Sequence, residues 1–305
     1  MPVCSRVKQI PPPVGDTSYV EVHILSYVAR LAGPTALLRK LAELRPRAPE
    51  WTTRGAPGLS TTFDGQPDSP TSGCHTVSRN GTLQHIVRPP EAILAVLDTA
   101  INAAAVEALQ ANYLLIHAGA VAHANQGVLL PAPSGRGKTT LVAGLVAAGF
   151  EYLSDEVGVL EPETLQLLPF AKCLGVKQGA LTTLAPLFPE LAARVPRLRS
   201  GQETIHYLTP PSGAWPAGPV RLRFLIAPRY VAGARTELVP MTRTSALSRL
   251  VEQVSVSPPD AGAGLLHLIQ AVRALDCYTL TMGNLQEGVD ELQRLVAGAR
   301  PPVLR

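Results

Sequence analysis

The sequence predicts an α/β protein made of a small, mostly β amino-terminal module, residues 1–90, and a larger α/β domain, residues 91–305. Three observations lead to this prediction. Strand and helix patterns alternate after residue 110, as they do in α/β folds. The first 90 residues carry short alternating segments around Asn80-Gly81, a dipeptide typical of a tight hairpin. Pro89-Pro90 then interrupts the chain before a long helical pattern begins.

The amino-terminal module contains few regular elements. Alternating apolar residues predict a strand over Tyr19–Leu25, and a helical period predicts a short helix over Pro34–Leu44. Leu59–Phe63 is a strand-like piece within a stretch rich in Pro, Gly, Thr and Ser. The hairpin joins His75–Asn80 to Thr82–Val87. We therefore expect an irregular, mostly β module.

The larger domain begins with a helical pattern over Glu91–Ala111, to which we assign a packing role and no chemistry. Apolar runs then predict strands over Tyr113–Ala124, Val128–Pro131, Phe150–Leu153, Val157–Leu160, Leu165–Leu168, Arg221–Ala227 and Tyr278–Met282. Helical periods predict helices over Thr139–Gly149, Ser245–Val254, Leu265–Leu275 and Asn284–Val296. Phe170–Gly179 is expected to be extended, and Leu181–Leu191 a broken helix. In such a layout a nucleotide binds at the carboxyl end of a strand.

The most specific motif follows the apolar run Gly127–Pro131 and reads APSGRGKTT. A loop that wraps a polyphosphate is a glycine-rich turn that ends in Gly-Lys-Thr, with a strand before it and a helix after it. We expect the phosphates to be held by Ser134, Gly135, Arg136, Gly137, Lys138, Thr139 and Thr140. In this interpretation Lys138 neutralises the β- and γ-phosphates, and the Thr139 hydroxyl binds magnesium. Ala132 stands where the full motif has glycine, and an ordinary strand–turn–helix connection is the alternative.

Phosphoryl transfer also needs a group that takes the proton of the acceptor. Asp155 is the best candidate for this base, because it ends the strand after the loop's helix and should return to the same sheet edge. Glu156 beside it is a candidate magnesium ligand or cap. His117 lies in the strand that leads toward the loop. Alternatively, Asp155 and Glu156 form an ordinary acidic turn after a strand, and His117 is a packed core residue.

These motifs resemble, in order and spacing, those of the HPr kinase/phosphorylase family. The resemblance rests on Ile116–Val121, on Ser134-Gly135 before Gly137-Lys138, and on Ser154–Val157, and it covers roughly Tyr113 to Gly179. It is closest to the divergent branch that phosphorylates precursor peptides such as those of lasso peptides. It implies a phosphoenolpyruvate-carboxykinase-like P-loop fold, with Asp155 as the base that accepts a serine proton and His117 beside it.

The chain departs from the family downstream of the acidic pair. The family's Glu-x-Arg-Gly-x-Gly motif corresponds here to Gly175-Val-Lys-Gln-Gly179, which lacks the glutamate that supports the reverse reaction. We therefore expect neither HPr as the substrate nor phosphorolysis. Lys177 takes the place of the arginine and is a candidate phosphate or acceptor contact, with a solvated loop lysine as the alternative.

The expected function is that of an ATP- and Mg²⁺-dependent kinase acting on a serine hydroxyl of a peptide or small protein, for example the ribosomal precursor of a natural product. Catalysis is assigned to Asp155, His117 and Lys138, and residues 1–90 are expected to help recognise the acceptor. Two alternatives stay open. One is a kinase for a small metabolite. The other is a nucleotide-dependent ATPase or switch that has no phosphoryl acceptor.

The amino-acid composition and charge of the chain limit the classes of partner that we expect. Hydrophobic residues make up 46% of the 305-residue chain and charged residues 16%, which is typical of a globular protein. The net charge of +4 is spread along the chain, so we expect no nucleic-acid partner. No apolar stretch is long enough to span a bilayer, and the amino-terminal residues lack the apolar core of a secretory signal. We expect a cytoplasmic protein without a membrane partner, and a homo-oligomer is compatible with the sequence.

Overall fold

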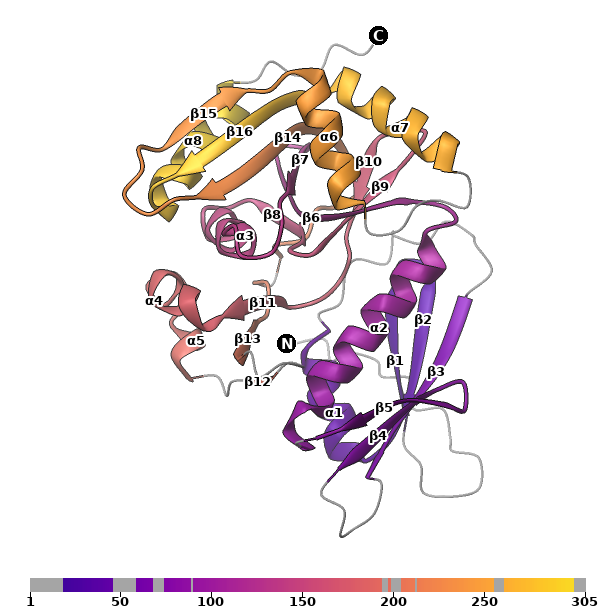
Figure 1. Ribbon diagram of the computed structural model, residues 1–305. Coiled ribbons are helices and arrows are strands. Elements are labelled where there is room, and N and C mark those ends of the chain that lie inside the picture. The colour runs from indigo at the N-terminus through magenta and orange to yellow at the C-terminus, as the bar shows by residue number, and fades with distance from the viewer. Residues whose placement is uncertain are drawn as a thin grey trace.

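The computed structural model describes residues 19–45, 59–67, 74–88, 90–193, 197–198, 204–211, 213–254 and 261–298 (Figure 1). These residues form a mixed α/β structure with three sheets, of five, eight and three strands. The prediction of an α/β fold is therefore confirmed. In the described part of the chain, no helix combines the length and the apolar character that crossing a membrane requires.

The first sheet has the strand order β1-β2-β3-β4-β5. Its strands are β1 (Tyr19–Ile24), β2 (Tyr27–Ala32), β3 (Leu59–Pro67), β4 (His75–Arg79) and β5 (Thr82–Val87). Asn80 and Gly81 both have positive φ, which is the geometry that Asn-Gly hairpin turns adopt, and β4 pairs with β5 as predicted. The strand β2 was not predicted from the sequence. It pairs with β1 through a turn at Leu25, whose φ is +54°, although Leu25 had been expected to continue the first strand.

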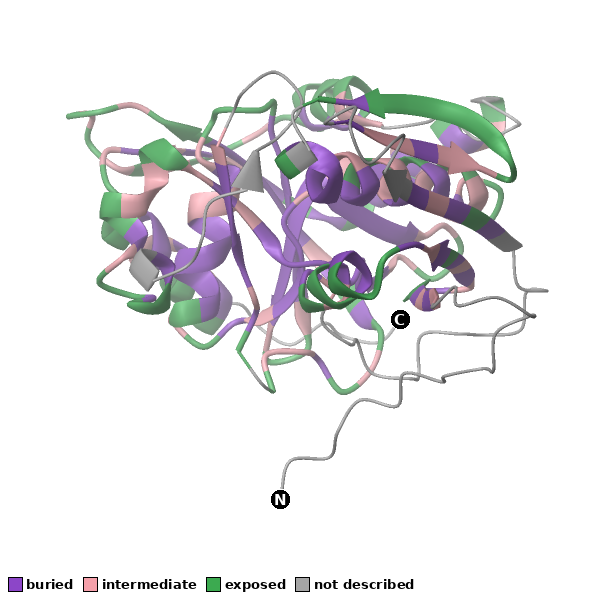
Figure 2. Cartoon of the chain, turned by 90° about the horizontal axis from the view of Figure 1, so that it is seen from below, coloured by how far each residue is buried: buried purple, intermediate pink, exposed green. Residues whose placement is uncertain are grey.

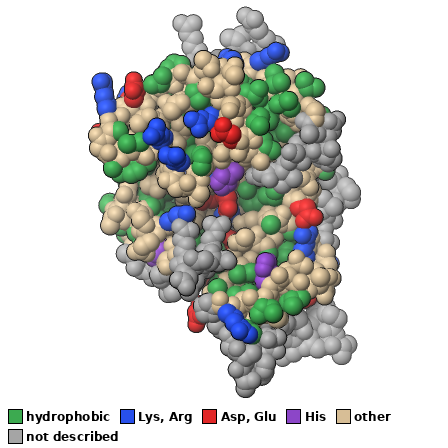
Figure 3. Space-filling view, viewed as in Figure 1, with side chains coloured by type: hydrophobic (Ala, Val, Ile, Leu, Met, Phe, Trp, Pro, Cys, Tyr) green, Lys and Arg blue, Asp and Glu red, His purple; other side chains and the backbone are tan. Residues whose placement is uncertain are grey.

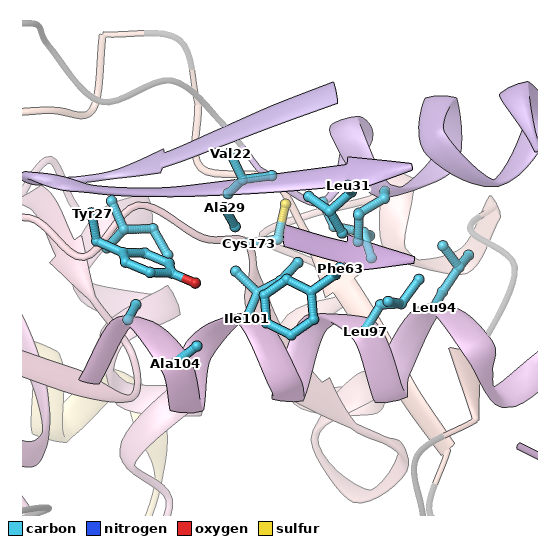
Figure 4. Close-up of a cluster of buried hydrophobic side chains, with 14 of the residues drawn as sticks. Val22, Tyr27, Ala29, Leu31, Phe63, Leu94, Leu97, Ile101, Ala104 and Cys173 are labelled. Atoms are coloured by element: carbon cyan, nitrogen blue, oxygen red, sulfur yellow. The ribbon is translucent and has the colours of Figure 1, made fainter. Parts of the chain in front are cut away.

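Helix α2 (Ile93–Leu109) packs on the first sheet together with α1 (Thr35–Glu43). Phe63, Leu97 and Ile101 lie in the core between α2 and the strands (Figure 4). Buried residues from beyond position 110 join the same core, among them Phe170 and Cys173. The division of the chain near residue 90 stays a prediction, but α2, which follows that point, is packed mainly on strands that precede it.

The large sheet has the strand order β10-β9-β6-β7-β14-β16-β15, with β8 paired to β6. Its strands are β6 (Leu114–His123), β7 (Gln126–Pro131), β8 (Glu151–Ser154), β9 (Val157–Glu161), β10 (Gln166–Leu168), β14 (Val220–Tyr230), β15 (Glu237–Pro240) and β16 (Asp276–Met282). The middle strands β7, β14 and β16 run parallel. β6 runs antiparallel to β7 and to β8. The sheet is therefore mixed, and its strand β15 was not predicted from the sequence.

Helices cover both faces of the large sheet (Figures 1 and 2). Val128, Leu130 and Phe224 pack with α3 (Lys138–Ala147) and α8 (Leu285–Gly298). Leu129 and Leu225, whose side chains point the opposite way, pack with α6 (Arg243–Gln253) and α7 (Ala261–Ala274). Successive residues of a strand face opposite sides of the sheet. The apolar residues of one strand therefore pack into the hydrophobic cores on both faces of the large sheet. These strands therefore read as continuous apolar segments in the sequence.

The third sheet is small and has the order β11-β13-β12. Its strands are β11 (Leu174–Lys177), β12 (Arg197–Leu198) and β13 (Thr204–Leu208). After β11 come a 3-10 turn, Gln178–Ala180, and two short helices, α4 (Leu181–Leu184) and α5 (Glu190–Ala193). The broken helix predicted over Leu181–Leu191 is confirmed. Within Phe170–Gly179, the segment expected to be extended, Leu174–Lys177 forms the strand β11.

Gly283 follows β16 at a point where two backbone segments approach closely. A Cβ atom at this position would lie 1.9 Å from the carbonyl oxygen of Ala234. Replacing Gly283 with alanine is expected to lower the free energy of unfolding by about 1–3 kcal/mol, because one backbone segment has to move. Gly218→Ala is the matched control, because no heavy atom lies within 4 Å of its added Cβ. Equal stabilities of the two variants in denaturant titration would contradict the expected crowding.

Candidate functional site

The glycine-rich loop connects β7 to α3, so the predicted order of strand, turn and helix is confirmed. Gly135 and Gly137 have φ of +83° and +84°, a conformation that side chains disfavour, and Gly137 is the N-cap of α3. The helix therefore begins at Lys138, with its amino-terminal N–H groups at the loop. Ala132 is buried, and its carbonyl oxygen accepts a hydrogen bond from Lys138 Nζ at 3.2 Å. The alanine at the position of the missing glycine is accommodated within this geometry.

Lys138 is held against His117, a histidine of β6. Lys138 Nζ lies 2.8 Å from Nε2 of His117, and an ammonium group can only donate. Burial lowers the pKa of His117, and the Lys138 charge lowers it further, so the neutral ring accepts this hydrogen bond. Burial also lowers the pKa of Lys138 to about 8, although the Asp155 and Glu156 carboxylates oppose the shift.

Asp155 lies at the same edge of the large sheet as the loop. Since β6 is antiparallel to both β7 and β8, those two strands run in the same direction and end at one edge. The Asp155 side chain is buried, and its two oxygens have different partners. Oδ2 accepts the Gly175 N–H at 3.0 Å, and Oδ1 lies 3.4 Å from the Tyr152 hydroxyl, whose one proton it shares with the carbonyl oxygen of Lys172 at 3.1 Å. These contacts orient the carboxylate before any substrate binds.

A buried lysine that the sequence analysis did not assign joins this group. Lys172 Nζ donates to Glu156 Oε2 and lies 3.9 Å from Oδ1 of Asp155. Burial lowers the pKa of Lys172, but the Glu156 and Asp155 carboxylates outweigh that effect and raise its pKa overall. The side chain therefore carries a positive charge between the two acids.

One cavity of about 660 Å³ brings most of the predicted site residues together. Its lining includes His117, Ser134, Gly135, Gly137, Lys138, Thr139, Thr140, Asp155, Glu156 and Lys177. Lys177 reaches the loop, where its Nζ lies 3.4 Å from Oγ of Ser134. Figure 3 shows acidic, basic and histidine side chains gathering midway between the first sheet and the large sheet.

Arg136 is the predicted loop residue that does not line the cavity. It is exposed, and its carbonyl oxygen accepts the N–H of Tyr230 at 3.2 Å. The structure therefore gives Arg136 a backbone role in seating the loop on the end of β14.

Helix α2 forms the opposite wall of the cavity. Asp98, Thr99 and Asn102 from this helix line the same space as the loop. Sequence reasoning assigned this helix to packing, because its apolar residues dominate the pattern. The polar residues that interrupt that pattern one turn apart, Asp98 and Asn102, were the available sign that this face is not part of the core.

The residues at the loop are suited to a magnesium ion bound with a nucleotide. The half-buried Thr139 and the Glu156 carboxylate both line the cavity and could supply oxygen ligands. The described residues include no group of three or more His, Cys, Asp and Glu placed to hold a metal ion by themselves. That is compatible with Mg²⁺, which usually takes one or two carboxylates together with water and substrate phosphates.

No protein-family model matches the sequence, and no curated protein matches it. The chemistry assigned to the site therefore rests on its own residues and on their geometry.

Proposed function

We propose that the protein is an ATP- and Mg²⁺-dependent kinase that phosphorylates a serine hydroxyl of a peptide or small protein. The observation that carries this proposal is the meeting of Lys138, His117 and Asp155 in one cavity at the amino-terminal end of α3. We also propose that the domain is a P-loop kinase domain of the phosphoenolpyruvate-carboxykinase-like type, on the resemblance of its motifs to the HPr kinase/phosphorylase family.

The loop side of the cavity would bind the polyphosphate. N–H groups at the start of α3 would donate to phosphate oxygens, and Lys138 would neutralise the β- and γ-phosphates. Lys177, whose Nζ lies 3.4 Å from Oγ of Ser134, would contact the terminal phosphate or the acceptor. Thr139 and Glu156 would hold Mg²⁺, which supplies charge neutralisation at the phosphates.

Asp155 would act as the base. Its carboxylate accepts the proton of the serine hydroxyl while the serine oxygen forms a bond to the γ-phosphorus and the bond to the β-phosphate oxygen breaks. ADP then leaves, and the phosphoserine carries the transferred group. His117, neutral beside Lys138, holds the lysine toward the phosphates without adding a second positive charge.

The test is a transfer experiment with γ-labelled ATP, Mg²⁺ and serine-containing peptides encoded near this chain. Each peptide has a matched control in which the serine is replaced by alanine, and mass spectrometry locates the phosphate. We expect label on the serine peptides and not on their alanine controls. Label that moves only to water would contradict the kinase and favour an ATPase or switch, and label on an added metabolite would favour a small-molecule kinase.

Nucleotide affinity is expected to fall as the pH rises through about 8. The pKa of Lys138 is lowered to about 8 in the free protein, so above that pH the lysine loses the charge that the phosphates require. The loss of one charge-assisted contact corresponds to about a tenfold rise in Kd between pH 7 and pH 9.5. Calorimetry with a non-hydrolysable ATP analogue measures this, and proton uptake on binding should appear above pH 8.

Lys138→Arg is the control for that pH dependence, because arginine keeps its charge throughout this range. Its affinity for the analogue should stay level up to pH 9.5. An equally level profile for the unmodified protein would contradict a role for Lys138 in binding phosphate.

A further inference from the structure

Tyr230 is an aromatic residue of the cavity to which the proposed phosphoryl transfer assigns no role. It is the last residue of β14, it is 51% exposed, and it lines the same cavity as the glycine-rich loop. A half-exposed ring at the border of a cavity offers an apolar face on which a flat ligand can stack. The surroundings of Tyr230 indicate which part of a nucleotide would reach it.

The backbone around Tyr230 is tied to the loop on one side and to β16 on the other. The N–H of Tyr230 donates to the carbonyl oxygen of Arg136 at 3.2 Å, and the N–H of Val231 donates to the carbonyl oxygen of Met282 at 2.9 Å. The Cβ atom of Tyr230 lies 3.2 Å from the position that a Cβ atom would take on Gly137. The tyrosine side chain therefore starts beside the last glycine of the loop.

The order of the strands places Tyr230 and Asp155 on opposite sides of the loop. The strand β7, which leads into the loop, lies between β6 and β14, and β8, which leads to Asp155, pairs with the other side of β6. Beyond β7, the strands β14 and β16 run parallel to it, so their last residues, Tyr230 and Met282, lie at the edge of the sheet that carries the loop. The loop is therefore in the middle of a row that runs from Asp155 to Tyr230.

This row sets the direction in which a bound nucleotide would lie. The γ-phosphate has to face Asp155, because the hydroxyl that Asp155 would deprotonate attacks the γ-phosphorus. In-line displacement places the leaving ADP opposite the attacking oxygen. The nucleoside would therefore extend away from Asp155, toward the ends of β14 and β16, where Tyr230 lies.

Three further residues line the cavity at and after the end of β16, namely Met282, Asn284 and Leu285. Together with Tyr230 they form a set of four uncharged side chains, which suits a nucleobase better than a phosphate. Oδ1 of Asn284 accepts the N–H of Glu287 at 2.9 Å. Since an amide oxygen accepts and an amide nitrogen donates, this bond leaves Nδ2 of Asn284 as the donor for a ring nitrogen of the nucleobase.

We propose that Tyr230 stacks on the nucleobase of the bound nucleotide and that Met282, Asn284 and Leu285 complete this nucleobase site. The inference rests on the proposed kinase function, which gives the direction of the nucleotide. The aromatic face supplies most of the affinity of the nucleobase site, because Tyr230 is half exposed and Asn284 offers one amide donor. The acceptor is then confined to the other end of the cavity, between Asp155 and α2.

The test compares two ligands by calorimetry at pH 7 with Mg²⁺, a non-hydrolysable ATP analogue and inorganic tripolyphosphate, which has no nucleobase. In Tyr230→Ala, the Kd of the analogue should rise about 5- to 100-fold, the range expected for loss of a stack between a nucleobase and an aromatic side chain. The Kd of tripolyphosphate should change by less than about twofold. Alanine keeps the backbone N–H that donates to Arg136, so the loop stays in place.

Three variants serve as controls. Tyr230→Phe keeps the aromatic face and should bind the analogue within about threefold of the unmodified protein. Tyr230→Leu keeps apolar bulk without a flat face and should bind it as weakly as Tyr230→Ala does. Leu266→Ala removes an exposed apolar side chain of α7, on the face of the large sheet opposite α3, and should bind both ligands normally.

Three results overturn the inference while leaving the kinase intact. One is an unmodified protein that binds the analogue no more tightly than tripolyphosphate. Another is a Tyr230→Ala variant whose two affinities equal those of the unmodified protein. The third is a Tyr230→Leu variant that binds the analogue as tightly as Tyr230→Phe, because apolar bulk would then suffice.

Failure of the proposed function has a different signature. If the unmodified protein binds neither ligand, the nucleotide site is contradicted, and the kinase and the nucleobase site are rejected together. If the variants bind as expected but no serine peptide is phosphorylated, the kinase alone is contradicted.

Discussion

Replacing Asp155 with asparagine is expected to reduce phosphoryl transfer by about 10²- to 10⁴-fold, the range typical for loss of a general base. Nucleotide affinity should change by less than about threefold, because Asp155 takes its proton from the acceptor, whereas the residues of the loop hold the phosphates. Asparagine preserves the shape of the side chain and can still accept the N–H of Gly175. Steady-state transfer and direct nucleotide binding, measured on the same preparation, test both halves of the prediction.

Asp276→Asn is the matched control for this substitution. Asp276 is an exposed carboxylate at the start of β16, while Met282, at the other end of that strand, lines the cavity. We expect this variant to behave like the unmodified protein. A near-normal rate of transfer in Asp155→Asn would show that another group accepts the proton.

Replacing Lys138 with alanine is expected to weaken nucleotide binding and turnover together. The ammonium group would contact the phosphates in both the ground state and the transition state, so its removal affects both. Charge-assisted hydrogen bonds contribute roughly 1.5–3 kcal/mol, which corresponds to a rise in nucleotide Kd of about 10- to 100-fold. The variant should fold, because burial already disfavours the charged form of this lysine.

Lys40→Ala, on the exposed side of α1, is the control for Lys138→Ala. Calorimetric titration with ADP and with an ATP analogue separates the contact to the γ-phosphate from the contact to the β-phosphate. If the two nucleotides bind to Lys138→Ala as they do to the unmodified protein, the loop does not use Lys138 as a phosphate ligand, and the nucleotide site itself would be in doubt.

Local sequence patterns predicted the parts of the site that depend on local geometry. Two glycines with positive φ and a lysine at the start of a helix form a loop whose conformation follows from its own residues. Strand order along the chain also suggested that Asp155 returns to the same sheet edge, which is where it lies. The short strands β13 and β15 were not predicted, because their pairing depends on distant partners rather than on a strong pattern of their own.

The glycine loop, the alternation of strands and helices, and the identity of Lys138 as its cationic residue could be determined from the amino-acid order alone. The tertiary structure decided what surrounds them. Lys172 and Asp98 have no motif, and their places at one cavity depend on how the segment before β11, helix α2 and the residues after α1 pack together. A pattern along the chain records periodicity and local conformation, whereas the compensation of a buried charge depends on which residues lie close in space.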